Sequence, residues 1–302
     1  MGHHYVPRFI LREWLVDVDH QRVLRGHYYD QFSNSMRTRL RGENFFCTVP
    51  NLFTVRGLPA GDDAIERHFF KSLDDAAAIA HKMILCGDPL SNRQRVDFVR
   101  LLLSLEARYP RMVRFVRQRG ATNALLMNSD SEIRQLLDEW GDARPANVVW
   151  DELVGFSSED QAMETVQKLT INEKIGRALT NAWWGTLRRS EDCDAFVLGD
   201  RPLIRIKGQL ARNNVWILPI SPDIVWFCAM GHETFEKVGQ IPPKRFVNMV
   251  NGWSALQSDK YVFSLQATSS NWLQKRLKRR AAENASQGQA EVRPDFHHRQ
   301  EF

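Results

Sequence analysis

Three residues of this 302-residue chain combine a reactive side chain with a position shortly before a proline: His4, Arg108 and Asp200. The imidazole of His4 could act as a general base or a metal ligand. The guanidinium of Arg108 suits a phosphate, because its fork matches two phosphate oxygens. The carboxyl of Asp200 follows an apolar run, where loop carboxylates often serve a site. We predict that these three catalytic candidates meet in one cleft.

Each of the three residues also has a simple structural interpretation. His4 could bond a backbone group and hold the N-terminus in place. Asp200 could close its own turn, because an aspartate often bonds the backbone two residues further on. Arg108 could pair with an acid elsewhere in the chain. The residues alone leave both interpretations open.

A divalent metal is a further hypothesis for the same residues. His4 and Asp200, together with Glu66, would supply the nitrogen and oxygen ligands of a hydrolytic metal site. The chain has no HExxH, paired DxD or tight HxH motif. The ligands would therefore have to meet from distant parts of the chain, and the identity of the metal stays unknown. No nucleotide or flavin motif is present, since GxGxxG and GxxxxGK[ST] are both absent.

Arginines are concentrated between Ser91 and Gly120, where there are eight of them against two acids. If one helix runs through this segment, several of them lie opposite its apolar stripe, and this face suits the phosphates of nucleic acid. The nucleic-acid-binding candidates are Arg93, Arg100, Arg111 and Arg114. A solvated helix face, or a partner for the acidic segment 128–164, is the alternative.

Composition places the chain among ordinary globular proteins, with 43% hydrophobic and 25% charged residues. No apolar run reaches the roughly 18 residues that a membrane span needs, and no signal peptide is visible. The four cysteines form no CxxC pair, which favours reduced structural thiols. We therefore expect a cytoplasmic protein without a membrane contact. The net charge of +5 favours polyanionic partners, and the oligomeric state cannot be read.

Periodicity predicts an α+β fold, with a helical middle and short strands near the N-terminus and in the C-terminal third. The predicted helices are 11–15, 63–86, a helix from 91 kinked at Pro110, 131–140, 158–184, 243–256 and 272–282. The predicted strands are 22–30, 44–55, 194–200, 214–221, 223–230 and 260–265. We expect residues 1–282 to form a single domain and residues 283–302 to form a disordered basic and polar tail.

Several phrases resemble the domain-of-unknown-function 4238 family, in order from residue 3 to about residue 260. They are His4-Tyr5-Val6-Pro7-Arg8-Phe9, Glu43-Asn44-Phe45-Phe46, Ile65-Glu66, Arg108 with Pro110, Leu198-Gly199-Asp200-Arg201-Pro202 and Leu218-Pro219-Ile220-Ser221-Pro222. Gly199 and Arg201 stand where the family more usually has Ser and Asn. The resemblance implies a shared fold and supplies no reaction.

Two classes of function follow from these residues. The first is a nucleic-acid-directed hydrolase, nuclease-like and metal-assisted, with a cleft formed by His4, Arg108 and Asp200. The second is a non-enzymatic module that binds nucleic acid or a protein partner through the arginine face. The sequence does not decide whether the protein is an enzyme.

Overall fold

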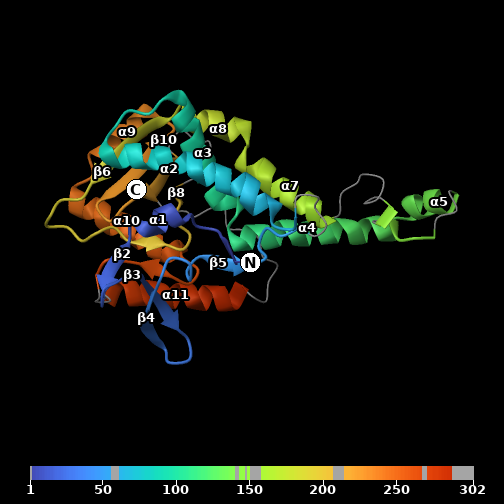
Figure 1. The fold of residues 1–302 in the computed structure, drawn as a ribbon, viewed down its shortest axis with the longest axis horizontal. Coiled ribbons are helices and arrows are strands. Elements are labelled where there is room, and N and C mark those ends of the chain that lie inside the picture. The colour runs from blue at the N-terminus through green and yellow to red at the C-terminus, as the bar shows by residue number, and fades with distance from the viewer. Residues whose placement is uncertain are drawn as a thin grey trace.

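The computed structural model shows an α+β protein, as predicted, with strands from both ends of the chain around a helical middle (Figure 1). It describes residues 2–55, 61–139, 143–146, 148–149, 158–206, 214–266 and 271–287. Among these residues, no helix is both long and apolar enough to cross a membrane. The long helix α4 (Pro110–Ser129) carries α5 (Ser131–Glu139) away from the sheets (Figure 1).

The helical middle starts with a π-helix, η1 (Ile65–Phe70), that continues directly into α2. Besides α4 and α5, it contains α2 (Lys71–Cys86), α3 (Asn92–Ala107), α7 (Ser158–Thr170) and α8 (Glu173–Thr180). Gly87 ends α2 with a left-handed backbone (φ 78°), which costs a glycine little. Ser91 and Gln94 form a capping box at the start of α3.

Two helices that were predicted to be continuous are broken. The helix from Ser91 ends at Ala107, and Pro110 begins a new helix instead of kinking the first one. Proline suits this position, because the first residue of a helix needs no N–H partner. The predicted helix 158–184 ends at Thr170, the side chain of Asn172 caps the separate helix α8, and Trp183 begins a strand.

The N-terminal region contains more strand than predicted. Its elements are β1 (Gly2–His4), α1 (Arg8–Arg12), β2 (Leu15–Val18), β3 (Gln21–Asp30), β4 (Ser35–Arg41) and β5 (Thr48–Pro50). β1 pairs antiparallel with β5, which places His4 opposite Thr48. The predicted strand 44–55 shortens to 48–50, because Cys47 and Asn51 both have left-handed backbones (φ 54°) that interrupt the extended chain.

The C-terminal third forms most of the sheet structure and contributes to both larger sheets. Its elements are β6 (Trp183–Arg188), β7 (Leu198–Gly199), β8 (Ile204–Ile206), β9 (Val215–Pro219), β10 (Ile224–Ala229), α9 (His232–Gly239), α10 (Pro243–Gln257), β11 (Val262–Phe263) and α11 (Asn271–Gln287). One sheet has the order β6-β10-β9-β8, and the other β2-β3-β11-β7 with β4 on β3. The second sheet therefore joins the two ends of the chain.

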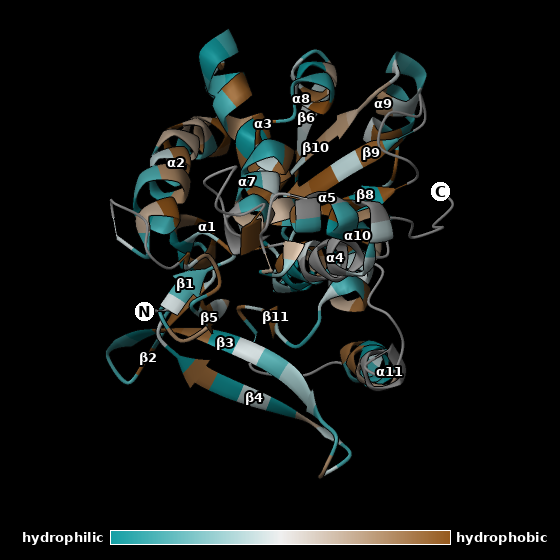
Figure 2. Ribbon diagram, turned by 90° about the vertical axis from the view of Figure 1, so that its right-hand side faces the viewer, coloured by the Kyte–Doolittle hydropathy of each residue, from teal (hydrophilic) through white to brown (hydrophobic). Residues whose placement is uncertain are grey.

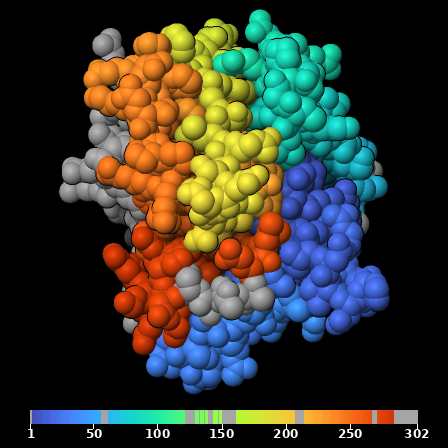
Figure 3. All heavy atoms as spheres, turned by 90° about the vertical axis from the view of Figure 1, so that its left-hand side faces the viewer, coloured from blue at the N-terminus to red at the C-terminus, as the bar shows by residue number. Residues whose placement is uncertain are grey.

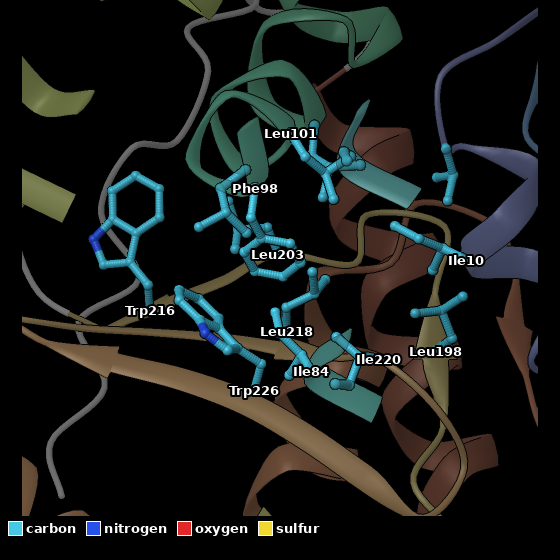
Figure 4. Packing of buried hydrophobic residues seen from close by; sticks show 14 of the residues in the cluster. Ile10, Ile84, Phe98, Leu101, Leu198, Leu203, Trp216, Leu218, Ile220 and Trp226 are labelled. Carbon is cyan, nitrogen blue, oxygen red and sulfur yellow. The ribbon is translucent and has the colours of Figure 1, made fainter. Parts of the chain in front are cut away.

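The main core lies where α3 packs on β9 and β10. Phe98 of α3 meets Trp226 of β10 with ring centroids 5.2 Å apart (Figure 4). Phe98 also meets Trp184 of β6, at 5.7 Å between ring centroids. Every residue of β9 and β10 is buried, and these strands are mainly hydrophobic (Figure 2). Each large apolar side chain buried in this way contributes about 1.5–3 kcal/mol, so this layer is a principal source of stability.

The last described helix lies against the N-terminal strands. Figure 3 shows α11 (red) beside the N-terminal segment (blue), and the side-chain amide of Gln31 donates to the carbonyl of Ala281 at 3.1 Å. These contacts and the shared sheet support our proposal that residues 1–282 form a single domain. α11 continues past Ala282 to Gln287, with Glu283 bonded to Arg279. The rest of the expected tail, 288–302, lies outside the described residues.

Candidate functional site

Arg108 is held inside the protein by an acid of α2. Its side chain is fully buried, and its Nη1 and Nη2 donate to the two carboxylate oxygens of Asp74 at 3.1 and 2.9 Å. Its guanidinium carbon lies 5.5 Å from the ring centroid of Phe70. This bidentate pair uses the fork that would otherwise face a phosphate. The geometry is that of an arginine paired with an acid elsewhere in the chain.

His4 and Arg108 both act on Glu66, which lies on the π-helix η1. Burial raises the pKa of Glu66 to about 7, although the charge of Arg108 and a hydrogen bond from the backbone N–H of His4 lower it. Burial, followed by the charge of Arg8, lowers the pKa of the His4 imidazole. His4 Nε2, Glu66 Oε2 and Arg108 Nε are buried without a hydrogen-bond partner. We call His4, Glu66, Asp74 and Arg108 the His4–Arg108 set.

Glu66 makes stability depend on pH in a defined direction. Between pH 4.5 and 7 the folded protein keeps a proton that the unfolded chain releases, so the contribution of Glu66 to the free energy of unfolding falls as the pH rises. Glu66→Gln stays neutral. We expect its melting temperature to match the unsubstituted protein at pH 4.5 and to exceed it by about 2–4 °C at pH 8, as thermal melts would show.

The matched control for this prediction is Glu164→Gln on α7. Glu164 pairs with Lys168 on the surface, with 48% of its side chain exposed, so its substitution should change neither melt by more than about 1 °C. An equal shift for Glu66→Gln at both pH values would contradict a titrating, buried Glu66.

The carboxylate of Asp200 binds the backbone of a distant turn instead of the backbone of its own turn. Its carboxylate accepts the N–H groups of Asp259 (2.8 Å), Lys260 (2.9 Å) and Tyr261 (3.0 Å). In return, its own N–H donates to the carbonyl of Tyr261 at 2.9 Å. Only 1% of Asp200 is exposed, and burial raises the pKa of its carboxyl although the three N–H groups lower it. Asp200 therefore fixes the turn between α10 and β11.

The turn held by Asp200 carries Asp259 into a group of arginines. The Tyr109 hydroxyl donates to Asp259, Arg111 Nε lies 3.1 Å from Asp259 Oδ2, and Arg280 Nη2 lies 3.3 Å from Asp259 Oδ1. The guanidinium carbon of Arg201 lies 5.2 Å from the Tyr109 ring centroid. Arg201 also reaches Glu106 at 3.4 Å. We call Tyr109, Arg111, Arg201, Asp259 and Arg280 the arginine–aspartate set.

Positive charge is crowded in the arginine–aspartate set. Burial, followed by the charges of Arg280, Arg114 and Arg201, lowers the pKa of Arg111 to about 10. Burial raises the pKa of Asp259 to about 6, although Arg280 lowers it. The set is not closed to solvent, because 20% of the Arg111 side chain and 23% of the Asp259 side chain are exposed. Arg111 is the most exposed of the three arginines, because the side chains of Arg201 and Arg280 are 12% and 6% exposed.

Consecutive residues serve the two sets. His4 contacts Glu66, whereas the next residue, Tyr5, meets the Tyr109 ring at 6.2 Å between centroids. Likewise Arg108 belongs to one set and Tyr109 to the other. Of the three predicted catalytic residues, the structure brings His4 and Arg108 together at Glu66 and puts Asp200 beside the arginine–aspartate set. Their shared cleft stays a prediction.

The arginines predicted to bind nucleic acid do not share one helix face, because α3 and α4 are separate helices. Arg93 and Arg100 are exposed on α3, Arg114 is exposed on α4, and Arg111 is half-buried against Asp259. The predicted arginine face required one helix through residues 91–120, and this helix is divided in two.

The structure explains the two departures from the family pattern. A Cβ added at Gly199 would lie 2.3 Å from Ser258 Oγ and 2.8 Å from the carbonyl oxygen of Ser254, so a serine here requires its neighbours to move. Arg201 lies over Tyr109 and bonds Glu106, which ties the turn to α3 and to the start of α4. Neither difference removes the hydrogen bonds of Asp200.

Neither a group of metal ligands nor a pocket is found at the residues predicted to form the site. Within the described ranges, no three His, Cys, Asp or Glu side chains are grouped so that they could hold a metal ion. Two adjoining pockets of about 350 and 280 Å³ lie beside α3, and others of about 800 and 210 Å³ lie beside α10 and β6. None of these four is lined by His4, Arg108 or Asp200.

Two residues of the arginine–aspartate set could not be singled out from the sequence. Asp259 and Arg280 lie outside every phrase that resembles the family. Arg280 ends the basic run Lys275–Arg280, but this run does not distinguish it from the neighbouring basic residues. Tyr109 and Arg201 could have been found from the sequence, because both lie inside such phrases. Tyr109 lies between Arg108 and Pro110, and Arg201 lies between Asp200 and Pro202.

The fold and these two sets define an α+β protein with ionisable side chains buried between its N-terminal strands, the junction of α3 and α4, and its last helix. The profile described as "Protein of unknown function (DUF4238)" matches residues 2–268, and the chain belongs to this family. Comparison with curated proteins and with solved structures found no significant match.

Proposed function

We propose that the protein is a hydrolase of phosphate-bearing substrates, with nucleic acid as the substrate class, and that a substrate phosphate binds at the arginine–aspartate set. The observation that carries this proposal is the gathering of Arg111, Arg201 and Arg280 around Tyr109 and the partly exposed carboxyl of Asp259. Arginine is the side chain best suited to hold a phosphate, because its planar fork binds two oxygens and stays charged.

The electrostatics of the set support an anionic ligand. The pKa of Arg111 is lowered by burial and by its arginine neighbours, so the protonated arginines repel one another. A phosphate between them would relieve this repulsion and would gain charge-assisted hydrogen bonds. The net charge of +5 also favours the binding of a polyanion.

The set also contains the groups that phosphate ester hydrolysis needs. Asp259, with a pKa of about 6, is basic enough at neutral pH to accept a proton from an attacking water. The arginines would stabilise the negative charge that develops on the phosphate oxygens. Whether a divalent metal takes part is decided in the assay, because substrate phosphates can themselves contribute ligands to Mg²⁺.

His4, Arg108 and Asp200 act as positioning residues in this proposal. Asp200 holds the turn that carries Asp259. Arg108 and His4 anchor the two segments that carry Tyr109 and Tyr5 through their interactions with Asp74 and Glu66. Their substitution should therefore change stability together with activity, whereas substitution of Asp259 should change activity first.

Cleavage of fluorescent single- and double-stranded oligonucleotides, with and without Mg²⁺, tests the proposal. We expect Asp259→Asn to lower the cleavage rate at least about 100-fold, because it removes the general base, and Arg111→Met to weaken binding and reduce its salt slope by about 1. The exposed Arg188→Ala on β6 is the matched control and should change neither. Melting temperatures confirm that each variant is folded.

Three outcomes decide between hydrolase, binding module and neither. Cleavage that survives Asp259→Asn unchanged would contradict the assigned site. Binding that weakens with salt but is never followed by cleavage would favour a non-enzymatic nucleic-acid-binding module. Absence of any binding at about 50 mM salt would contradict both functions.

A further inference from the structure

We propose a second ligand site, for a nucleoside monophosphate, in the two adjoining pockets between α2, α3, α7 and α8. α2, α7 and α8 all pack on α3 (Figure 1). The pockets measure about 350 and 280 Å³ and share Arg100 and Ile171 as their common wall. The larger one has the size of a small-molecule pocket, which typically starts at about 300 Å³.

The break between α7 and α8 creates the larger pocket. α7 ends at Thr170, and the side chain of Asn172 restarts the chain as α8 by accepting the N–H of Ile175 at 3.0 Å. Gly176 then faces the pocket, and a Cβ added there would meet no atom within 4 Å. A continuous helix, or a larger residue at Gly176, would take up this space.

The lining of the larger pocket suits a nucleobase. Its inner side is apolar, formed by Val96, Val99 and Leu103 of α3, on which a flat ring can pack. Asn92 and Asn181 lie in the same lining, and an asparagine amide can donate to and accept from a base edge at once. An apolar surface with a few polar groups is the usual composition of a specific small-ligand pocket.

The smaller pocket suits the phosphate. It is lined by Arg93 and Arg100 of α3 together with Ser72 and His68, so two guanidinium groups and a hydroxyl can meet one phosphate. Asp97 lies 3.7 Å from Arg100, and half of the Arg100 side chain is exposed. Asp97 lines the same pocket with 17% of its side chain exposed. An ion pair of this length contributes little, so Arg100 can turn from Asp97 to a stronger anion.

This site is separate from the arginine–aspartate set. None of the residues named for the two pockets belongs to that set or to the His4–Arg108 set. It gives Arg93 and Arg100, which the sequence marked for nucleic acid, a role in holding one phosphate of a small ligand.

The test is binding of adenosine, guanosine, cytidine and uridine 5′-monophosphates to the full chain, measured by calorimetry. We expect at least one of them to bind with a micromolar Kd. Gly176→Phe should weaken that affinity at least about tenfold, because the ring fills the base pocket, and Arg100→Met should do so by removing a phosphate contact. Adenosine or another nucleoside without phosphate should bind at least about tenfold more weakly.

Gly239→Phe on α9 is the matched control, since a Cβ there also meets no atom within 4 Å and lies outside both pockets. It should leave the affinity unchanged. Absence of binding by all four nucleotides at millimolar concentration, or equal affinity for Gly176→Phe, overturns the proposal. Inorganic phosphate binding as tightly as the best nucleotide overturns the base pocket. Oligonucleotide cleavage should be unaffected by Gly176→Phe, which keeps this test independent of the proposed hydrolase.

Discussion

Replacing Arg108 with alanine is expected to lower the free energy of unfolding by about 3–5 kcal/mol, the cost of breaking a buried ion pair. The substitution leaves the Asp74 carboxylate without its two hydrogen bonds and opens a cavity beside Phe70. It also removes a positive charge that lowers the pKa of Glu66. Denaturant unfolding, followed by fluorescence of the buried tryptophans, measures the change.

Two further variants separate the effect of losing the Arg108–Asp74 ion pair from a nonspecific loss of stability. Arg100→Ala removes an exposed arginine of α3, so its effect should stay within about 0.5 kcal/mol. Arg108→Ala combined with Asp74→Ala should cost less than the sum of the two single substitutions, because the double variant leaves no unpaired carboxylate. If Arg108→Ala is as stable as Arg100→Ala, the pair does not hold α2 against the α3–α4 junction.

Asp200→Ala is expected to have a comparable effect by a different route. Three backbone N–H groups of the 259–261 turn lose their acceptor, and each buried unsatisfied donor costs about 1–3 kcal/mol. A loss on the order of 3–6 kcal/mol follows, together with displacement of Asp259 from Tyr109 and Arg111. Thermal and denaturant unfolding of the full chain measure this loss.

Asp200→Asn distinguishes a positioning role from folding alone. Its single carbonyl oxygen can keep part of the N–H set, so we expect a smaller loss of stability but a clear loss of oligonucleotide cleavage. Asp223→Ala is the matched control, because Asp223 bonds Arg189 with 48% of its side chain exposed and should cost less than about 1 kcal/mol. Full activity in a folded Asp200→Asn variant would argue against control of Asp259 by Asp200.

The local signals of the chain predicted the boundary between α2 and α3, but they missed the break between α3 and α4 and the break between α7 and α8. The caps at Gly87 and Ser91 depend on residues no more than four positions away, so the end of α2 and the start of α3 could be predicted from the sequence. Strands were harder: β4 was missed, and the aromatic run 44–55 kept only three strand residues, because its pairing with β1 depends on a partner more than 40 positions away.

By itself the sequence determined the α+β class, the helical middle and the segments around His4, Arg108 and Asp200 that resemble the family. Only the tertiary structure decided which residues act together. Arg108 finds Asp74 34 positions away, and Asp200 finds its N–H partners 59 to 61 positions away. A charged side chain reads the same in sequence whether it faces solvent, a substrate or a buried partner, because its burial and its bonds come from distant segments that pack around it.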